Sequence, residues 1–336
     1  MKKFRVMLLV IIFLSTACVC FGKDTSGLFM IKQSNKFGYI NKNGNIIIPP
    51  QFDKCGDFSE GLAAVVIGNK VGYVDVTGKV IIKPQFRFDE EFNSAKFVVW
   101  KLSDEGLARV KIENNYGYID KSGKIVIKPQ FDNAYRFVEG LAGIVIGNKY
   151  GFIDRNGKIV INPQFDMVGG FNEGLSYIKI GNKSGYINRT GKIVINPQFY
   201  FAKTFYEGRA VVVTELGQPW TYIDTNGKIV TTLYDSAGNF SEGLAYVKSK
   251  GKYGYIDKNG NFIIKPKFND ARPFNEGLAA VKIGDNWGYI NKNNKIIINP
   301  QFDDAFEFRD GLARVVLGNK WGYIDKTGKY IWNPTN

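Results

Sequence analysis

The side chains that could do acid–base or metal chemistry in this 336-residue chain are almost all carboxylates, because the sequence contains no histidine. This removes the usual general base at neutral pH and the commonest metal ligand in proteins. A Ser-His-Asp triad, a Cys-His pair and a histidine-containing zinc site are therefore excluded. Of the three cysteines, only Cys55 lies in the body of the chain, so it has no partner there for an internal disulfide and no histidine to activate it.

One row of carboxylates opens recurrent Asp-x-x-Gly segments, and a row of this kind could be metal ligands. The residues are Asp75, Asp120, Asp154, Asp224, Asp257 and Asp325. Asn41, Asn188 and Asn291 occupy the same place in other copies. Both residue types cap a turn through a side-chain oxygen, whereas only aspartate carries charge. The interchange predicts turn capping, and we expect neither a metal nor a cofactor.

A second row of carboxylates lies in Phe-x-Glu-Gly segments, at one residue per copy. The residues are Glu60, Glu139, Glu173, Glu207, Glu242 and Glu276, with Asp310 in the last copy. A glycoside hydrolase needs two carboxyl groups held about 5–10 Å apart at one place. One acid in every copy instead predicts a structural hydrogen-bonding position, and a protein that is not an enzyme. A carboxylate pair among the unmatched acids Asp89, Glu90, Glu91, Asp104 and Glu105 remains a remote glycosidase alternative.

The elements that position these side chains repeat with a period of about 34 residues. The last copy shows the parts in order: an apolar run at 312–316, a Gly-Asn-Lys turn, an aromatic-Gly-Tyr-Ile run, an Asp-x-x-Gly turn and a final apolar run. A connector, Pro-Gln-Phe-Asp to Phe-x-Glu-Gly, joins successive copies. β-Branched and aromatic runs bounded by turn residues predict an all-β protein of three-stranded antiparallel meanders. We place about nine units near 28–61, 62–106, 107–140, 141–174, 175–208, 209–243, 244–277, 278–311 and 312–336, all within an array at 23–336.

The glycine inside the central strand is the signature of the repeat. It occurs as Gly38, Gly72, Gly117, Gly151, Gly185, Gly254, Gly288 and Gly322. A glycine in a strand interior marks a bulge or the close approach of another group. We expect it to leave room for a bulky group from a neighbouring unit or connector, with Phe302 and Phe308 as candidates.

The two ends of the array bear on how the units are arranged. It opens with a first-strand run at 28–31 and closes with a third-strand run at 330–332, so the ends do not resemble halves of one split blade. Nine blades would also exceed the usual propeller range of 4–8. The expectation is an open, curved, solenoid-like array. The alternative is propeller-like closure, with the connector adding a short fourth strand.

Two places break the period, and insertions in repeat proteins often map to a binding face. The first is an insertion around 87–105, with Arg87, Asp89, Glu90, Glu91 and Trp100 as binding-loop candidates. The second is the stretch 215–234, where Thr221 replaces the glycine. Neutral variation in a tolerant loop is the alternative explanation for both.

The N-terminus predicts export, because residues 1–22 have a positive start, a short apolar run and small residues before a cleavage point, as in a signal peptide. The apolar run is too short for an uncleaved membrane anchor of about 20 residues. The segment ending at Cys18 also resembles a bacterial lipobox, with Ser15 where that motif has leucine. Lipidation of Cys18 and ordinary cleavage both stay open. We expect a periplasmic, cell-envelope or extracellular location.

The segments KWGYID at 320–325 and WGYI at 287–290, with the Pro-Gln-Phe-Asp to Glu-Gly-Leu-Ala connectors, resemble the bacterial WG (KWG) repeat family. The resemblance extends from about residue 28 to 334, although tryptophan precedes the glycine only at Trp287 and Trp321. Val71 and Ser184 depart furthest from the pattern. The resemblance implies a bacterial β-repeat protein, often exported, with no assigned activity. It brings no catalytic residues.

The net charge of +14 and the long repeat surface suggest a binding or scaffold protein of the bacterial envelope with a protein or polymer partner. The alternative is binding to an anionic polysaccharide or lipid surface through in-phase lysines. These are Lys79, Lys124, Lys158, Lys192, Lys228 and Lys329 after one turn, and Lys70, Lys149, Lys183 and Lys320 before the central strand. We favour the explanation that these lysines form a solvated rim, which keeps the strand edges soluble and unpaired. The signal peptide argues against nucleic acid, and we expect contact with a membrane only through the N-terminal lipid anchor.

Overall fold

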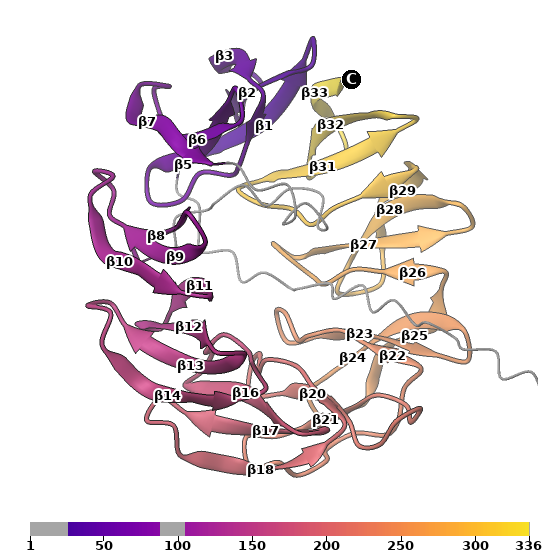
Figure 1. Ribbon diagram of the computed structural model, residues 1–336. Coiled ribbons are helices and arrows are strands. Elements are labelled where there is room, and N and C mark those ends of the chain that lie inside the picture. Colours follow the sequence, from indigo (N-terminus) through magenta and orange to yellow (C-terminus); the bar gives the residue numbers. More distant parts are fainter. Residues whose placement is uncertain (1–25, 88–104, 336) are drawn as a thin grey trace, which may run out of the picture.

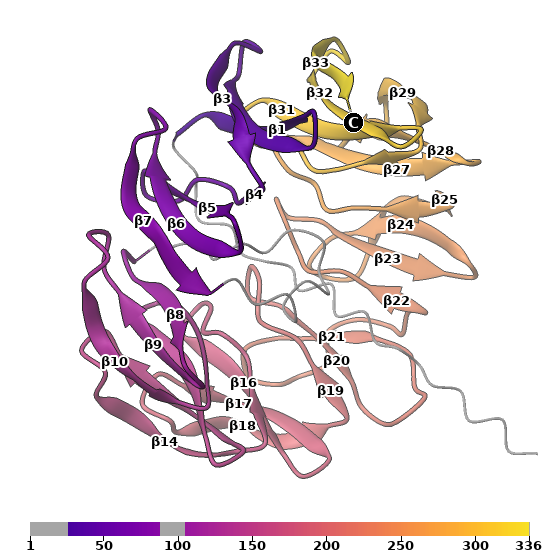
Figure 2. The ribbon, with the colours of Figure 1, turned by 45° about the horizontal axis from the view of Figure 1, so that its top comes forward.

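Nine antiparallel sheets form a ring of blades in the computed structural model, which describes residues 26–87 and 105–335 (Figure 1). Every regular element in these two ranges is a β-strand. In each blade the strands are hydrogen-bonded in chain order, running from the centre of the ring outward (Figures 1 and 2). No helix suited to crossing a membrane occurs in the described part of the chain.

The strands fall into nine blades along the chain. Blades 1 to 3 contain β1 (Leu28–Gln33), β2 (Lys36–Asn41), β3 (Ile46–Phe52); β4 (Lys54–Cys55), β5 (Leu62–Ile67), β6 (Lys70–Asp75), β7 (Val80–Arg87); and β8 (Ala108–Ile112), β9 (Asn115–Ile119), β10 (Ile125–Phe131). Blades 4 to 6 contain β11 (Asn133–Val138), β12 (Leu141–Ile146), β13 (Lys149–Asp154), β14 (Ile159–Phe165); β15 (Met167–Val168), β16 (Leu175–Ile180), β17 (Lys183–Asn188), β18 (Ile193–Phe199); and β19 (Phe201–Ala202), β20 (Ala210–Val213), β21 (Thr221–Ile223). Blades 7 to 9 contain β22 (Ser236–Ala237), β23 (Ala245–Ser249), β24 (Lys252–Ile256), β25 (Phe262–Phe268); β26 (Asp270–Ala271), β27 (Leu278–Ile283), β28 (Asn286–Asn291), β29 (Ile296–Phe302); and β30 (Asp304–Ala305), β31 (Leu312–Leu317), β32 (Lys320–Asp325), β33 (Tyr330–Thr335).

The connector contributes a short innermost strand to most blades, and this strand pairs with the meander that follows it. Asp304 and Ala305, for example, pair with Val316 and Val315 of β31. A sheet therefore begins inside the connector, whereas the sequence-based units began at the first long strand. In blades 1, 3 and 6 the described residues form three strands.

The ring closes by contact between blade 9 and blade 1, so the expectation of an open array was wrong and propeller-like closure, the stated alternative, is the observed arrangement (Figure 1). Nine hydrophobic clusters each join two adjacent blades, and the ninth joins Phe29, Ile31 and Ile40 to Leu312 and Tyr323. The physical reason is burial, because each blade packs on a neighbour through both faces. An open array would leave one apolar face uncovered at each end.

The signature glycine makes room for backbone, not for a side chain. Trp287 pairs with Phe302 and Tyr289 with Ile298, so β29 bulges outward between these pairs. A Cβ on Gly288 would lie 2.6 Å from the Ile298 carbonyl oxygen and 2.7 Å from the Pro300 nitrogen. At all eight signature glycines the nearest atom to such a Cβ is a carbonyl oxygen of the outer strand of the same blade, at 2.4–2.6 Å.

The expectation that Phe302 and Phe308 fill the space beside the glycine was therefore wrong. Phe308 instead packs across the junction between blades, with its ring centre 4.9 Å from that of Tyr289. The Tyr289 hydroxyl donates to the Phe306 carbonyl oxygen at 2.8 Å. The tyrosine after the glycine thus ties its own blade to the segment that follows the innermost strand of the next blade, by ring contact and by hydrogen bond.

Candidate functional site

The recurrent Glu-Gly pairs form tight hairpin turns near the centre of the ring. Ser241 and Leu244 exchange two backbone hydrogen bonds of 2.9 and 3.2 Å across Glu242 and Gly243. Both central residues have positive φ, 54° for Glu242 and 85° for Gly243, as in a type I′ turn. Glutamate in this conformation costs about 1–2 kcal/mol relative to glycine. A residue held there at such a cost must be stabilised by something outside the turn.

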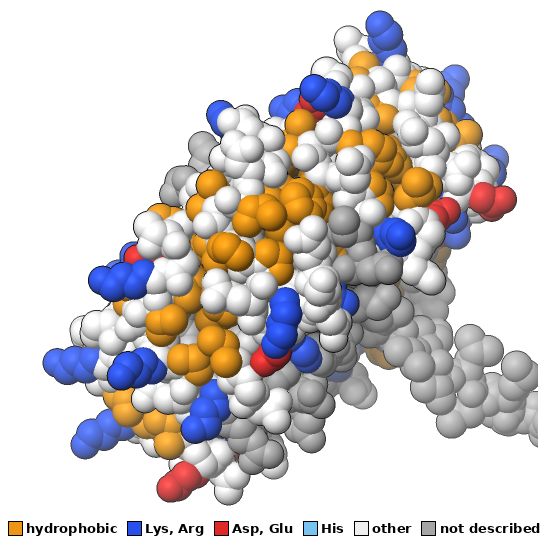
Figure 3. Space-filling model, turned by 90° about the horizontal axis from the view of Figure 1, so that it is seen from above, with side chains coloured by type: hydrophobic (Ala, Val, Ile, Leu, Met, Phe, Trp, Pro, Cys, Tyr) orange, Lys and Arg blue, Asp and Glu red, His pale blue; other side chains and the backbone are white. Residues whose placement is uncertain are grey.

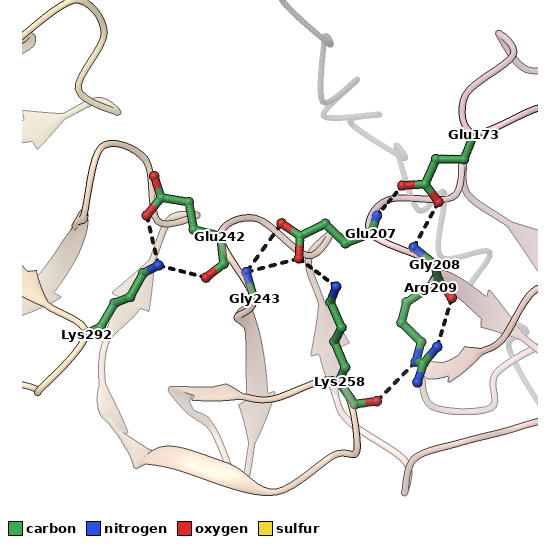
Figure 4. A network of polar contacts seen from close by, with 8 residues as sticks. All are labelled: Glu173, Glu207, Gly208, Arg209, Glu242, Gly243, Lys258 and Lys292. Carbon is green, nitrogen blue, oxygen red and sulfur yellow. Dashed lines mark hydrogen bonds and ion pairs between the residues drawn. The ribbon is translucent and has the colours of Figure 1, made fainter.

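The compensating contact is made with the next blade (Figure 4). The carboxylate of Glu207 in blade 6 accepts hydrogen bonds from the Gly243 backbone N–H, at 3.0 and 3.3 Å, and pairs with Lys258 Nζ at 3.1 Å. Gly243 and Lys258 both belong to blade 7. Glu242 of blade 7 repeats the pattern with Gly277 and Lys292 of blade 8.

The bridge recurs from blade to blade, and we call it the Glu–Gly network. Its further backbone bonds run from Gly140 to Glu105, from Gly174 to Glu139, from Glu207 and Gly208 to Glu173, and from Gly311 to Glu276. The prediction that these acids hold a structural hydrogen-bonding position is confirmed. The carboxylates are spread around the ring, one at each bridged junction.

Glu105 was assigned wrongly to the insertion from sequence. It occupies the same turn position as the other glutamates, and its carboxylate accepts from the Gly140 N–H at 2.7 Å. The signal was present in the sequence, because Glu105-Gly106-Leu107 matches Glu60-Gly61-Leu62. The sequence analysis also missed the cations that reach the network, such as Lys121, which pairs with Glu60 at 2.7 Å.

The backbone bonds contribute more to the network than the ion pairs do. The glutamate side chains in the ion pairs are 27–31% exposed and their lysine partners 42–48% exposed. Exposed ion pairs contribute about 0–1 kcal/mol. A hydrogen bond from a backbone N–H to a charged acceptor contributes about 1.5–3 kcal/mol. The network is thus mainly a means of holding the hairpin of one blade against the next.

The Asp-x-x-Gly carboxylates cap their own turns, as predicted. Asp75 accepts from the Thr77 N–H at 2.9 Å, the Thr77 hydroxyl at 2.6 Å and the Lys79 N–H at 3.0 Å. The hydrogen bond from the Thr77 hydroxyl is the largest cause that lowers the pKa of Asp75. Asn41 accepts the equivalent backbone bonds from Asn43 and Asn45. Within 26–87 and 105–335, no three His, Cys, Asp or Glu side chains gather as a metal site would require.

Blades 8 and 9 carry a row of alternating aromatic and cationic side chains that the sequence analysis did not identify. The Arg272 guanidinium lies 4.9 Å from the ring centre of Trp287 and 4.2 Å from that of Phe306. Arg314 lies 4.1 Å from the ring centre of Phe306 and 5.8 Å from that of Trp321. Arg272 also pairs with Asp304 at 2.7 Å. The row joins the two blades through cation–π contacts, which strengthen when partly desolvated.

The in-phase lysines separate into two sets. Lys79, Lys124 and their equivalents stand at the start of the outermost strands, on the rim of the ring. Lys70, Lys149 and their equivalents open the central strands, on one flat side of the ring. Some lysines of this second set have partners, such as Lys149, which pairs with Asp166 at 2.6 Å.

Most binding-loop candidates lie outside the described residues. Asp89, Glu90, Glu91 and Trp100 fall in 88–104, and Cys18 and the predicted signal peptide at 1–22 fall in 1–25. Arg87 is the last residue of β7, where its backbone pairs with Lys70. The predictions made for these residues stay predictions.

Comparisons with known proteins agree with this architecture. A family model described as "WG containing repeat" matches residues 37–70, 72–116, 116–150, 150–183, 185–215, 220–253, 253–287 and 287–321. No curated protein sequence matches the chain significantly. Among solved structures, a eukaryotic initiation factor is similar over 92% of this chain and 96% of its own, at 14% identity and a TM-score of 0.64. The dihydro-heme d1 dehydrogenase NirN, at 13% identity over 84% of this chain and 75% of its own, has a TM-score of 0.48. At 14% identity the likeness to the initiation factor concerns the fold alone.

Proposed function

Since the chain belongs to the family of WG-containing repeat proteins, we propose that it is a non-catalytic binding or scaffold protein of the bacterial cell envelope. The observation that carries this proposal is the use of the recurrent carboxylates. Each bridging glutamate is bonded to backbone N–H groups of the adjacent blade, as Glu207 is to Gly243, so the acids serve cohesion. What the repeats leave for a partner is the surface of a large ring.

The proposal predicts a saturable partner in envelope extracts. The immobilised full chain should retain a defined protein or polymer, and the free folded chain should compete for it. The heat-unfolded chain is the matched control, because it keeps the composition and charge of the protein and loses the ring. The proposal would be contradicted if the free folded chain failed to compete for the retained partner, or if the unfolded chain retained it equally well.

The remote enzymatic alternative can be tested in the same preparations. The proposed function predicts that the purified chain hydrolyses no envelope glycan. Hydrolysis that is lost when one of the acids Asp89, Glu90, Glu91, Asp104 or Glu105 is changed to its amide, with circular dichroism unchanged, would contradict the proposed non-catalytic role.

A second candidate function, binding to an anionic polymer or lipid surface, is supported by the lysines of the rim. The outermost strands that the structure describes, β3, β7, β10, β14, β18, β25, β29 and β33, contain no Asp or Glu. Retention on an anionic column should then fall steeply with added salt, since each neutralised anion releases counterions. A flat salt response would remove this candidate.

A further inference from the structure

The rim of the ring combines exposed aliphatic side chains with basic ones. In β7, Val80 and Ile81 are 42% and 39% exposed, and in β10, Ile125 and Val126 are 43% and 46% exposed. The same pair of apolar positions recurs in most outer strands. Figure 3 shows hydrophobic side chains forming a band along the upper side of the ring, with Lys and Arg side chains on both of its borders.

Blades 2 and 3 have a lysine at both ends of this apolar pair. Lys79 and Lys83 flank it in blade 2, and Lys124 and Lys128 flank it in blade 3. All four lysines are exposed. Among the described residues none of the four forms an ion pair. Side-chain and backbone hydrogen bonds lower the pKa of Asp75 and Asp120, and the charges of Lys79 and Lys124 lower it further by a smaller amount. We call these four lysines and the two apolar pairs the rim patch.

The two strands of the rim patch are held side by side. A Cβ placed on Gly123, the residue before Lys124, would lie 3.1 Å from the Ile82 side chain of β7. Ile82 itself is 3% exposed and anchors the strand, so the preceding pair, Val80 and Ile81, faces outward. Strand β7 bulges at Pro84, where its pairing with β6 is interrupted, and the proline has no backbone N–H to donate. Both features disfavour another β-strand as the occupant of this edge.

We infer that the rim patch is a contact site for an anionic lipid bilayer, with the ring standing on its edge. This rests on the proposed binding function and names its target. Lysines beside exposed aliphatic groups suit a membrane surface, since the cations meet anionic headgroups and the aliphatic groups enter the acyl boundary. A glycan would favour exposed aromatic faces for stacking, and the exposed apolar residues of this patch are Val and Ile. The curvature of the rim limits a flat surface to a few adjacent blades.

The test compares three variants of the full chain, all in a Cys18→Ala background that removes any contribution from lipidation. The rim variant carries Lys→Gln at positions 79, 83, 124 and 128. The face variant carries Lys→Gln at positions 70, 183, 252 and 320, which are also exposed and lose the same charge. The aliphatic variant carries Ile81→Ser and Val126→Ser. Circular dichroism and the melting temperature check that each variant folds.

Binding is measured by flotation with phosphatidylcholine vesicles that contain or lack phosphatidylglycerol, and in parallel on heparin. We expect binding to the anionic vesicles to fall by about tenfold or more in the rim variant and to change less than about twofold in the face variant. The aliphatic variant should lose vesicle binding several-fold and keep heparin binding.

Three outcomes would overturn the inference. Equal losses in the rim and face variants would indicate general electrostatic attraction, and an aliphatic variant with full vesicle binding would indicate a soluble polyanion as ligand. No vesicle binding by the parent chain would reject the bilayer outright. If a saturable partner is nevertheless captured from envelope extracts, the proposed binding function stands while this inference fails.

Discussion

At the scale of single residues, the repeat depends on two positions whose side chains look unusual for where they stand. Gly288 and its equivalents do not have the positive φ that would require a glycine, so the reason for glycine at this position is steric. Glu242 and its equivalents have a positive φ that glutamate disfavours. The first position removes a Cβ that would collide with the outer strand, and the second reaches a partner that a shorter residue would not.

Replacing Gly288 with alanine should destabilise the protein by about 2–3 kcal/mol, because the new Cβ would overlap backbone that cannot rotate away. Urea unfolding followed by circular dichroism measures the free energy of unfolding. Gly143→Ala is the matched control, since Gly143 also lies in a strand and its Cβ would meet Tyr135 at an ordinary 3.4 Å. Equal effects of the two substitutions would show that the bulge is not the reason for the glycine.

Glu242→Asn tests whether the bridge between blades outweighs the strain of the turn. Asparagine is favoured at positive φ, so it improves the local turn, but it is too short for the Gly277 N–H and Lys292. We expect a net loss of about 1 kcal/mol from the lost charged hydrogen bond. Glu242→Gln, which keeps the reach, should lose less. A gain in stability for Glu242→Asn would mean that the turn preference dominates.

At the scale of the element, each blade is a meander whose turns are capped locally and whose outer edge is closed to further pairing. The oxygen that caps the turn can belong to a neutral amide or to a charged carboxylate, as Asn41 and Asp75 show. The bulge with its proline protects the edge of the outer strand. A blade therefore specifies its own strands and turns, and it depends on its neighbours for burial.

Acid should destabilise the blades through the turn aspartates. Hydrogen bonding from the Thr77 hydroxyl and backbone holds the pKa of Asp75 below its ordinary value, so its contribution to stability is present above about pH 4 and is lost as the pH falls through the lowered pKa. Asp75→Asn should match the parent at pH 7 and lose less stability between about pH 4 and pH 2. Thermal melts across this range measure the difference, and identical acid limbs would contradict the assignment.

At the scale of the whole molecule, closure depends on a contact that blade 1 makes in its own way. At seven other junctions in the described part of the chain, a connector phenylalanine covers the tyrosine or phenylalanine that follows the signature position of the preceding blade, as Phe58 covers Tyr39 at 4.8 Å. At the closing junction Phe29, from β1 itself, lies 5.4 Å from Tyr323. The equivalent of Phe29 in blades 2 to 9 is alanine or serine, for example Ala63 and Ser176.

Phe29→Ala should therefore weaken closure by about 3 kcal/mol, because it removes a buried ring from the junction. Trp321 and Trp332 pack against the same cluster, so tryptophan fluorescence should shift toward that of exposed tryptophan before the rest of the protein unfolds. Small-angle scattering would show a larger radius if the ring opens. A Phe29→Ala protein with the fluorescence and melting temperature of the parent would rule out this role.

The sequence by itself determined the period, the three long strands, the capped turns and the structural role of the Phe-x-Glu-Gly acids, because hydrophobic alternation and turn chemistry act within a few residues. Only the tertiary structure decided that the array closes, that the glycine faces backbone, and that each glutamate reaches the next blade. Closure follows from small rotations that accumulate over nine junctions, and no single repeat encodes that sum. Phe29 is a local feature of the first repeat that contributes to closure, but its role is recognisable only from its contact with Tyr323, at the far end of the chain.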